Sequence, residues 1–154
     1  MIMRRAFSRH IFSKGCSNLQ SKLRAVGAGR TIHVTRAAQY KDAMPAEANQ
    51  LLKEEGYNYL DVRTAEEFSA GHAPSAVNVP VVFLGSGGMS PNPAFLSDVQ
   101  RVFPKKDEAL VVGCKSGRRS LMAIDAMSQA GYSNLVNVVG GFDLWAAQGL
   151  PVER

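Results

Sequence analysis

One cysteine in this chain stands in surroundings that suit nucleophilic chemistry. Apolar residues 109–112 lead through Gly113 to Cys114, and the six residues that follow are Lys115, Ser116, Gly117, Arg118, Arg119 and Ser120. A loop of small residues between a strand and a helix can turn its backbone N–H groups toward one centre. Those groups, the helix dipole and three cations all favour a thiolate, so we expect Cys114 to ionise below the pKa of about 8.5 of a free cysteine. The same features predict that the loop binds an anion.

A buried, inert cysteine at the end of a strand is the alternative interpretation of Cys114. The second cysteine, Cys16, lies in an N-terminal stretch that we expect to be removed. Cys114 would then stand alone, which excludes a disulfide and a Cys-rich zinc site. We therefore expect no metal and no cofactor, only chemistry on the cysteine itself.

The hydrophobic pattern predicts the elements that must position this loop. Residues 109–113 are predicted as a strand and residues 119–130 as a helix. Further helices are predicted at 43–55, 94–103 and 142–148, and a short helix is predicted to begin at the capping box of residues 64–67. Further strands are predicted at 57–62, 76–80 and 135–139. Residues 84–93, rich in Gly, Pro and Ser, are predicted as a loop. This order is typical of one α/β domain with a central, mainly parallel sheet and helices on both faces.

The basic charge of the chain is concentrated in its first 36 residues. These hold eight of the 18 Lys and Arg residues and no acid, so residues 37–154 carry ten bases against all 13 acids. A mildly acidic domain gives no indication of nucleic-acid binding, and we expect no association with a membrane. The tail, Arg-rich and without acids, is typical of an organelle transit peptide, disordered in itself, for a mitochondrion or alternatively a chloroplast. A disordered basic tail that stays attached is the other possibility. Residues 37–154 are predicted to form the domain.

Three segments resemble the rhodanese family of sulfurtransferases, most closely its plant-type single-domain members. They are residues 60–68 with 71–80, residues 114–120, and residues 140–145 with 149–151. Their order and spacing match the family over about residues 40–152. One departure is Ser75, where the family usually has glycine.

The resemblance implies a rhodanese-like domain with thiosulfate sulfurtransferase activity. Cys114 would take the outer sulfur of thiosulfate as a persulfide and pass it to cyanide or a thiol, with a thioredoxin-like protein as one such acceptor. Arg119 occupies the position of the family's loop-closing arginine and is expected to act with Cys114, holding the loop and the anion. The residues expected to bind the substrate are Lys115, Ser116, Gly117, Arg118, Ser120 and Arg63. We expect the protein to be a monomer.

Several polar and aromatic residues have plainer interpretations. Asp61 and Arg63 lie at the end of the strand predicted at 57–62. For both, the structural alternative to a role in the site is an ion pair that pins the strand end. His72 is interpreted as a turn residue bonded to backbone and Asn78 as a partner of backbone groups. Trp145 and Phe142 are interpreted as aromatic residues of the core or its rim.

Two other functions remain open for this chain. A phosphatase or arsenate reductase on the same fold also uses a cysteine in an anion-binding loop, typically with five residues between the cysteine and an arginine. Here Arg119 is the fifth residue after Cys114 and Ser120 the sixth, so the loop is one residue short, which favours sulfur over phosphate. The second alternative is a redox-sensing or partner-binding module without catalysis.

Overall fold

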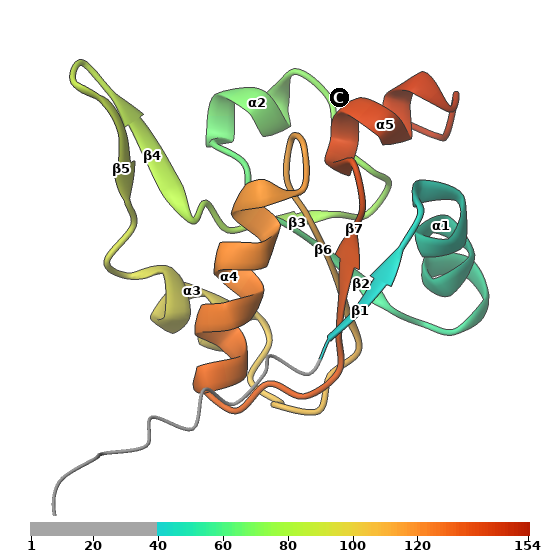
Figure 1. Cartoon of the computed structure of the whole chain (residues 1–154), viewed down its shortest axis with the longest axis horizontal. Helices are drawn as coiled ribbons and strands as arrows, with labels where there is room; N and C mark the ends of the chain where they lie inside the picture. Colours follow the sequence, from blue (N-terminus) through green and yellow to red (C-terminus); the bar gives the residue numbers. More distant parts are fainter. Residues whose placement is uncertain (1–39) are drawn as a thin grey trace, which may run out of the picture. The chain divides into compact units, whose positions relative to one another are not determined.

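The computed structural model describes residues 40–154, so the expected transit peptide and Cys16 lie outside the described residues. The central sheet has five parallel strands in the order β1-β7-β6-β2-β3. Their bounds are β1 Tyr40–Ala43, β2 Asn58–Asp61, β3 Val77–Asn78, β6 Leu110–Gly113 and β7 Leu135–Val138. Because parallel strands are joined by crossovers, helices cover the sheet, as Figure 1 shows. The predicted fold class is confirmed.

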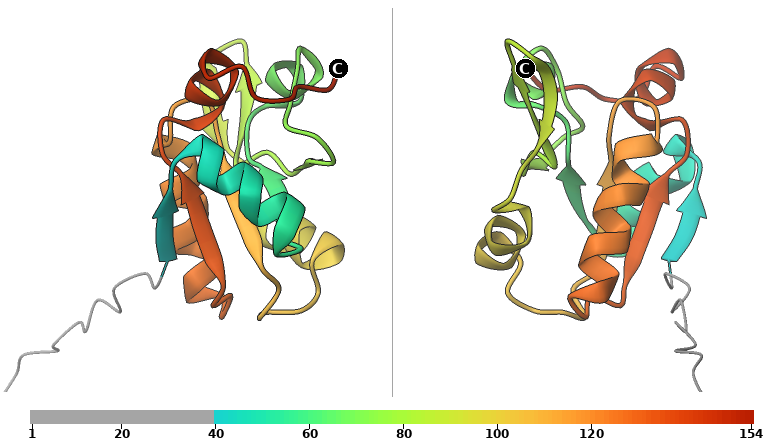
Figure 2. Two further views of the ribbon diagram at one scale, coloured as in Figure 1. Left: turned by 90° about the vertical axis from the view of Figure 1, so that its right-hand side faces the viewer. Right: turned by 60° about the vertical axis from the view of Figure 1, so that its left-hand side comes forward.

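Helices pack on both faces of the sheet, which gives two separate hydrophobic cores (Figure 2). The helices are α1 Pro45–Glu54, α2 Ala65–Ser69, α3 Phe95–Val102, α4 Arg118–Gln129 and α5 Gly141–Ala147. One core joins the sheet to α3 and α4, and the other joins it to α1 and α5. Among the described residues, no helix is both long and apolar enough to cross a membrane.

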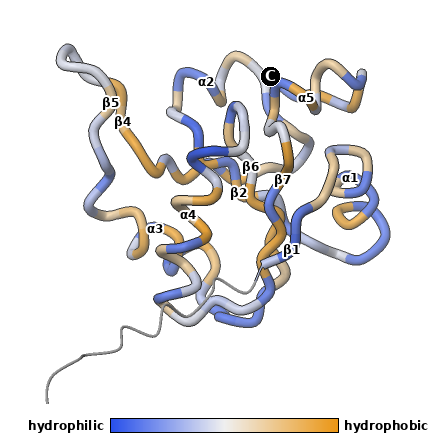
Figure 3. Tube along the Cα trace, in the orientation of Figure 1, coloured by the Kyte–Doolittle hydropathy of each residue, from blue (hydrophilic) through white to orange (hydrophobic). Residues whose placement is uncertain are grey.

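The strands contribute alternate side chains to the two cores. In β6, Leu110 and Val112 belong to the core beneath α3 and α4, while Val111 belongs to the core beneath α1 and α5. This alternation follows from the two-residue period of a strand. Both faces of β6 are buried, so the strand is apolar throughout (Figure 3).

Strand β1 was not predicted, and the expected order that began with a helix was wrong. Two of its four residues, Lys41 and Asp42, are exposed and charged. Within the part of the chain that the structure describes, the strand lies at the edge of the sheet and pairs with β7 alone. An edge strand needs neither an apolar run nor a strict alternation, so the sequence carries no signal for it.

The predicted loop at 84–93 is instead mostly a β-hairpin. Strands β4 (Val82–Gly85) and β5 (Gly88–Pro91) pair antiparallel and project away from the central sheet in Figure 1. Glycine and proline weaken strand propensity, but here they supply the tight turn and the end of the hairpin. Apart from Val82, the hairpin's strand residues are exposed.

Ser75 is the one non-glycine residue with a positive φ, 58°, among the described residues. L-residues with a side chain visit this left-handed region at a steric cost. The backbone conformation thus explains why glycine is usual at this position of the family. The N–H of Ser75 donates to the Glu153 carboxylate at 3.1 Å, which helps to hold the turn.

Candidate active site

Cys114 lies directly after β6, at the carboxyl edge of the sheet. Its Sγ accepts a hydrogen bond from the N–H of Gly117 at 3.1 Å and is 3.7 Å from the Ser120 hydroxyl. The residue is 1% exposed. A backbone amide aimed at the sulfur stabilises negative charge on it, which an inert cysteine does not require. The expected curl of the loop around Cys114 is therefore present, with one amide bonded to the sulfur.

The turn into α4 depends on Gly117, which caps the helix with a φ of 95°. Only glycine adopts this conformation without strain. It places the first turn of a twelve-residue helix next to the sulfur, so unpaired N–H groups and the positive end of the helix dipole lie beside Cys114.

The residues expected to bind a substrate divide into two groups. Lys115, Ser116 and Arg118 are exposed, whereas Gly117 and Ser120 are buried. The two exposed cations flank the loop on either side of Gly117 and are placed to attract an anion from solution.

Ser120 is held by a buried residue that the sequence analysis did not single out. Its hydroxyl donates to Oδ1 of Asn137 at 2.7 Å and lies 2.9 Å from the carbonyl of Gly117. Nδ2 of Asn137 donates to the Asp42 carboxylate at 2.8 Å, which fixes the orientation of the amide because a carboxylate only accepts. The available signal was one asparagine inside a strand otherwise made of apolar residues, since a buried amide needs partners.

Arg63 does not lie with the exposed cations, and its expected role in substrate binding stays a prediction. Its guanidinium donates to both carboxylate oxygens of Asp61 at 2.7–3.0 Å, and also to the carbonyl of Gly71 at 2.7 Å. The ring of Phe142 covers it at 4.0 Å. The side chains of Arg63 and Asp61 are 5% and 0% exposed. The structure thus supports the alternative, an ion pair that pins the end of β2.

Arg119 joins the loop after Cys114 to α2. Its two terminal nitrogens donate to the two carboxylate oxygens of Glu67 at 2.7 and 2.8 Å. These charge-assisted bonds lower the pKa of Glu67 to about 2 and raise the pKa of Arg119. The role of Arg119 in holding the loop is thus visible as a bridge to α2. Its expected contact with an anion stays a prediction.

The ion pair predicts how stability changes with acid. Glu67 has its ordinary pKa of 4.5 when unfolded and about 2 when folded, so the pair stabilises the fold fully above pH 4.5 and less as the pH falls toward 2. We expect Glu67→Gln to cost most at neutral pH and least near pH 2.5, as measured by urea unfolding. Glutamine keeps the capping box. The exposed Glu55→Gln serves as the control, and a cost that does not change with pH would contradict the assignment.

Helix α5 supports the loop from the other side. The N–H groups of Phe142 and Asp143 donate to the carbonyls of Cys114 and Lys115 at 2.8 and 3.0 Å. Figure 1 shows the start of α5 beside the turn between β6 and α4. The two amides belong to the first turn of α5, where N–H groups have no partner within the helix, so they restrain the backbone of Cys114 and Lys115.

The interpretations of the remaining residues are confirmed. Nδ1 of His72 is 3.1 Å from the carbonyl of Phe68, and Nδ2 of Asn78 donates to the carbonyls of Asp61 and Arg63 at 2.9 and 3.0 Å. Trp145 is fully buried.

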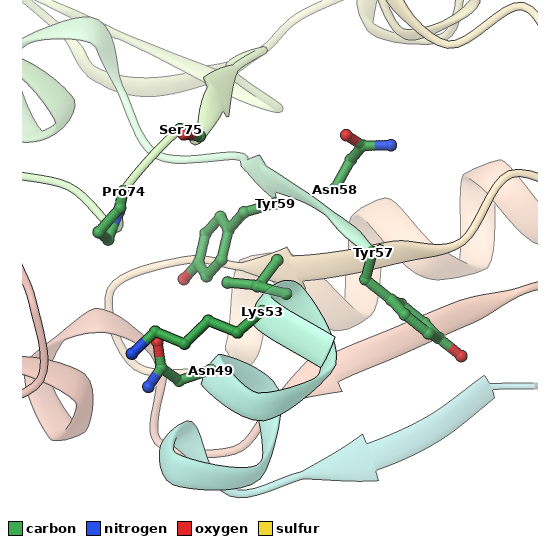
Figure 4. Close-up of a pocket in the computed structure, with 8 residues that line it drawn as sticks. Asn49, Lys53, Tyr57, Asn58, Tyr59, Pro74 and Ser75 are labelled. Carbon is green, nitrogen blue, oxygen red and sulfur yellow. The ribbon is translucent and has the colours of Figure 1, made fainter. Parts of the chain in front are cut away.

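A cavity of about 180 Å³ lies away from the loop, on the α1 side of the sheet (Figure 4). None of its lining residues belongs to the segment 114–120, so it is not the opening to Cys114. The lining residues are Asn49, Leu52, Lys53, Tyr57, Asn58, Tyr59, Pro74 and Ser75.

Comparison with known proteins identifies the family of this chain. The family model of the rhodanese-like domain matches residues 44–148. The chain is 48% identical to thiosulfate sulfurtransferase 16, chloroplastic, from Arabidopsis thaliana, over 64% of this chain and 81% of that protein. It is 43% identical to the protein HIGH ARSENIC CONTENT 1, mitochondrial, from the same plant, over 64% of this chain and 58% of that protein.

Solved structures agree with the sequence comparison. The crystal structure of a rhodanese-related protein from Thermoplasma volcanium matches with a TM-score of 0.56 and 28% identity, over 74% of this chain and 98% of that one. A cysteine at the carboxyl edge of a parallel sheet, the three matching segments and the family model agree. The chain therefore belongs to the rhodanese-like domain family.

Proposed function

We propose that this protein is a sulfurtransferase that carries sulfur on Cys114. The observation that carries the proposal is the hydrogen bond of 3.1 Å from the Gly117 amide to Sγ, at the start of α4 and between two exposed cations. Amides and cations around a sulfur stabilise both a thiolate and the terminal sulfur of a persulfide. The name of the Arabidopsis thiosulfate sulfurtransferase supports the same activity.

In the first step the Cys114 thiolate attacks the outer sulfur of thiosulfate. A bond forms between Sγ and that sulfur, the S–S bond of thiosulfate breaks, and the electron pair leaves with sulfite. In the second step cyanide or a thiolate attacks the outer sulfur of the persulfide, and Cys114 leaves as a thiolate. Neither step requires a cofactor, a metal or an external oxidant, and neither requires a general base once the thiolate has formed.

Burial of the sulfur sets a condition on both steps. Cys114 is 1% exposed, so the donor and the acceptor reach Sγ only when side chains around the loop shift. The exposed side chains of Lys115 and Ser116 can move while the backbone carbonyls of Cys114 and Lys115 stay bonded to α5. We propose thiosulfate as the donor because its two negative charges suit the cations of the loop, and a small thiol, a thioredoxin-like protein or cyanide as the acceptor.

We expect incubation with thiosulfate to add one sulfur atom to the peptide that contains Cys114. Mass spectrometry after digestion measures this, with the peptide that contains Cys16 as an internal control in the same chain. Later addition of cyanide must remove the sulfur. Parallel assays with arsenate plus a thiol reductant and with a phosphate ester test the alternative activities. Turnover of arsenate or the ester without sulfur on Cys114 would contradict the proposal.

The N-terminal residues 1–36 support delivery of the protein to an organelle. They are rich in arginine and hold no acid, as transit peptides do. The relatives named chloroplastic and mitochondrial support an organelle in general. We propose the mitochondrion, with the chloroplast as the alternative.

A further inference from the structure

We propose that Glu67 is a specificity-determining residue, whose carboxylate engages Arg119 and thereby reduces the preference of the site for doubly charged donors. Lys115, Arg118 and the loop amides are then left to capture the anion. This inference rests on the proposed sulfur-transfer function. It differs from the expectation that Arg119 itself holds the anion.

The contacts of Arg119 are the first argument. Both of its terminal nitrogens bind Glu67 in a two-bond arrangement at 2.7 and 2.8 Å. The side chains of Arg119 and Glu67 are 14% and 26% exposed. Paired charges of this kind act on a third ion nearly as a neutral unit, so the arginine contributes little attraction while the pair is intact.

The position of Glu67 is fixed from a second direction. It is the third residue of α2, and one of its carboxylate oxygens accepts a hydrogen bond from the N–H of Thr64 at 3.1 Å. The Thr64 hydroxyl in turn accepts from the N–H of Glu67 at 3.4 Å. This capping box holds the carboxylate in place, so moving Glu67 away from Arg119 would also break its bond to the N–H of Thr64. With a folded pKa of about 2, Glu67 stays charged throughout the neutral range.

Proximity to the sulfur is the third argument. Arg119 lies in the first turn of α4, beside Ser120, whose hydroxyl is 3.7 Å from Sγ. Removing one negative charge near a site strengthens the binding of a dianion by about 3- to 10-fold, and of a monoanion by only about the square root of that factor. The change is smaller at high salt because ions screen it.

The test is Glu67→Gln with two sulfane donors of different charge, thiosulfate and the singly charged benzenethiosulfonate. Glutamine suits the capping box equally well and can still accept a bond from Arg119. We expect the KM for thiosulfate to fall about 3- to 10-fold and the KM for benzenethiosulfonate by about 2- to 3-fold. In 0.5 M salt the fall in KM for thiosulfate must come closer to that for benzenethiosulfonate, so that the difference between the two shrinks by about half or more.

Glu66→Gln is the matched control, because Glu66 lies beside Glu67 on the same short helix but is fully exposed and does not contact Arg119. We expect it to change either KM less than about 2-fold. An unchanged or raised KM for thiosulfate in Glu67→Gln would overturn the inference, because Glu67 would then only orient Arg119. An equal fall for both donors would overturn it as well.

Arg118→Gln provides a second measurement that does not depend on Glu67 or α2. If exposed cations capture the donor, this variant raises the KM for thiosulfate more than that for benzenethiosulfonate. An equal effect on the two KM values would count against the inference.

The proposed function is tested separately by the persulfide on wild-type Cys114. If that persulfide forms but the KM ratios do not change, only the role of Glu67 fails.

Discussion

Replacing Cys114 by serine is expected to lower sulfur transfer from thiosulfate by at least about 10⁴-fold. Serine cannot form a persulfide, and its hydroxyl is not ionised near neutral pH, so both steps lose the atom on which they depend. The fold is expected to survive, because an oxygen can also accept the hydrogen bond from the Gly117 amide and the side chain stays small. Turnover of thiosulfate with cyanide, followed as thiocyanate, measures the activity.

Cys16→Ser is the matched control for this variant. It removes the other cysteine of the chain, and we expect it to transfer sulfur at the wild-type rate. Thermal unfolding followed by the fluorescence of the buried Trp145 checks that Cys114→Ser is folded. Residual activity above about 1% of wild type in a folded Cys114→Ser protein would rule out Cys114 as the nucleophile.

Gly141→Ala is expected to reduce both stability and activity strongly. A Cβ at this position would lie 2.4 Å from the carbonyl oxygen of Cys114 and 2.5 Å from that of Lys115. The residue also has a φ of 61°, which alanine adopts at a cost. Overpacking of about 1–3 kcal/mol and backbone strain of about 1–2 kcal/mol give an expected loss of about 2–5 kcal/mol.

The clash falls on the carbonyls that α5 holds in place. The amides of Phe142 and Asp143 donate to those two oxygens, so moving these groups apart disturbs the backbone of Cys114. We therefore expect sulfur transfer to fall at least about 10-fold even in protein that is still folded. Urea unfolding and thiocyanate formation on the same preparation measure the two effects.

Gly149→Ala separates backbone strain from the clash with the loop carbonyls. Its φ of 68° is nearly the same, but a Cβ there would meet nothing within 4 Å. We expect it to cost only the strain of about 1–2 kcal/mol and to leave activity unchanged. If both variants lost equal stability, contact with the loop carbonyls would not be the reason that residue 141 is glycine.

Local signals in the sequence predicted the strand, the loop and the helix around Cys114. An apolar run that ends at Cys114, small residues after it and a helical pattern beyond describe a strand, a loop and a helix, and each depends on neighbours within a few residues. The capping box at Thr64 and Glu67 is equally local and is confirmed. The resemblance to the rhodanese family, carried by three such segments, is also confirmed.

The segments at the edges of the fold have weaker hydrophobic patterns in the sequence. Strand β1 is charged, and the hairpin formed by β4 and β5 is mostly exposed. Neither has to be apolar, because hydrogen bonds to a neighbouring strand hold these segments rather than burial on both faces. Patterns of hydrophobic residues therefore predicted the centre of the sheet better than its periphery.

The sequence by itself determined which residue can act as a nucleophile and which cations accompany it, because these lie next to one another in the chain. Only the tertiary structure decided how distant polar groups pair. Glu67 meets Arg119 across 52 positions and Asn137 meets Asp42 across 95, and Arg63 is withdrawn into an ion pair beneath Phe142. Such pairs depend on the order of strands in the sheet and on which face each side chain enters, and no local pattern encodes either.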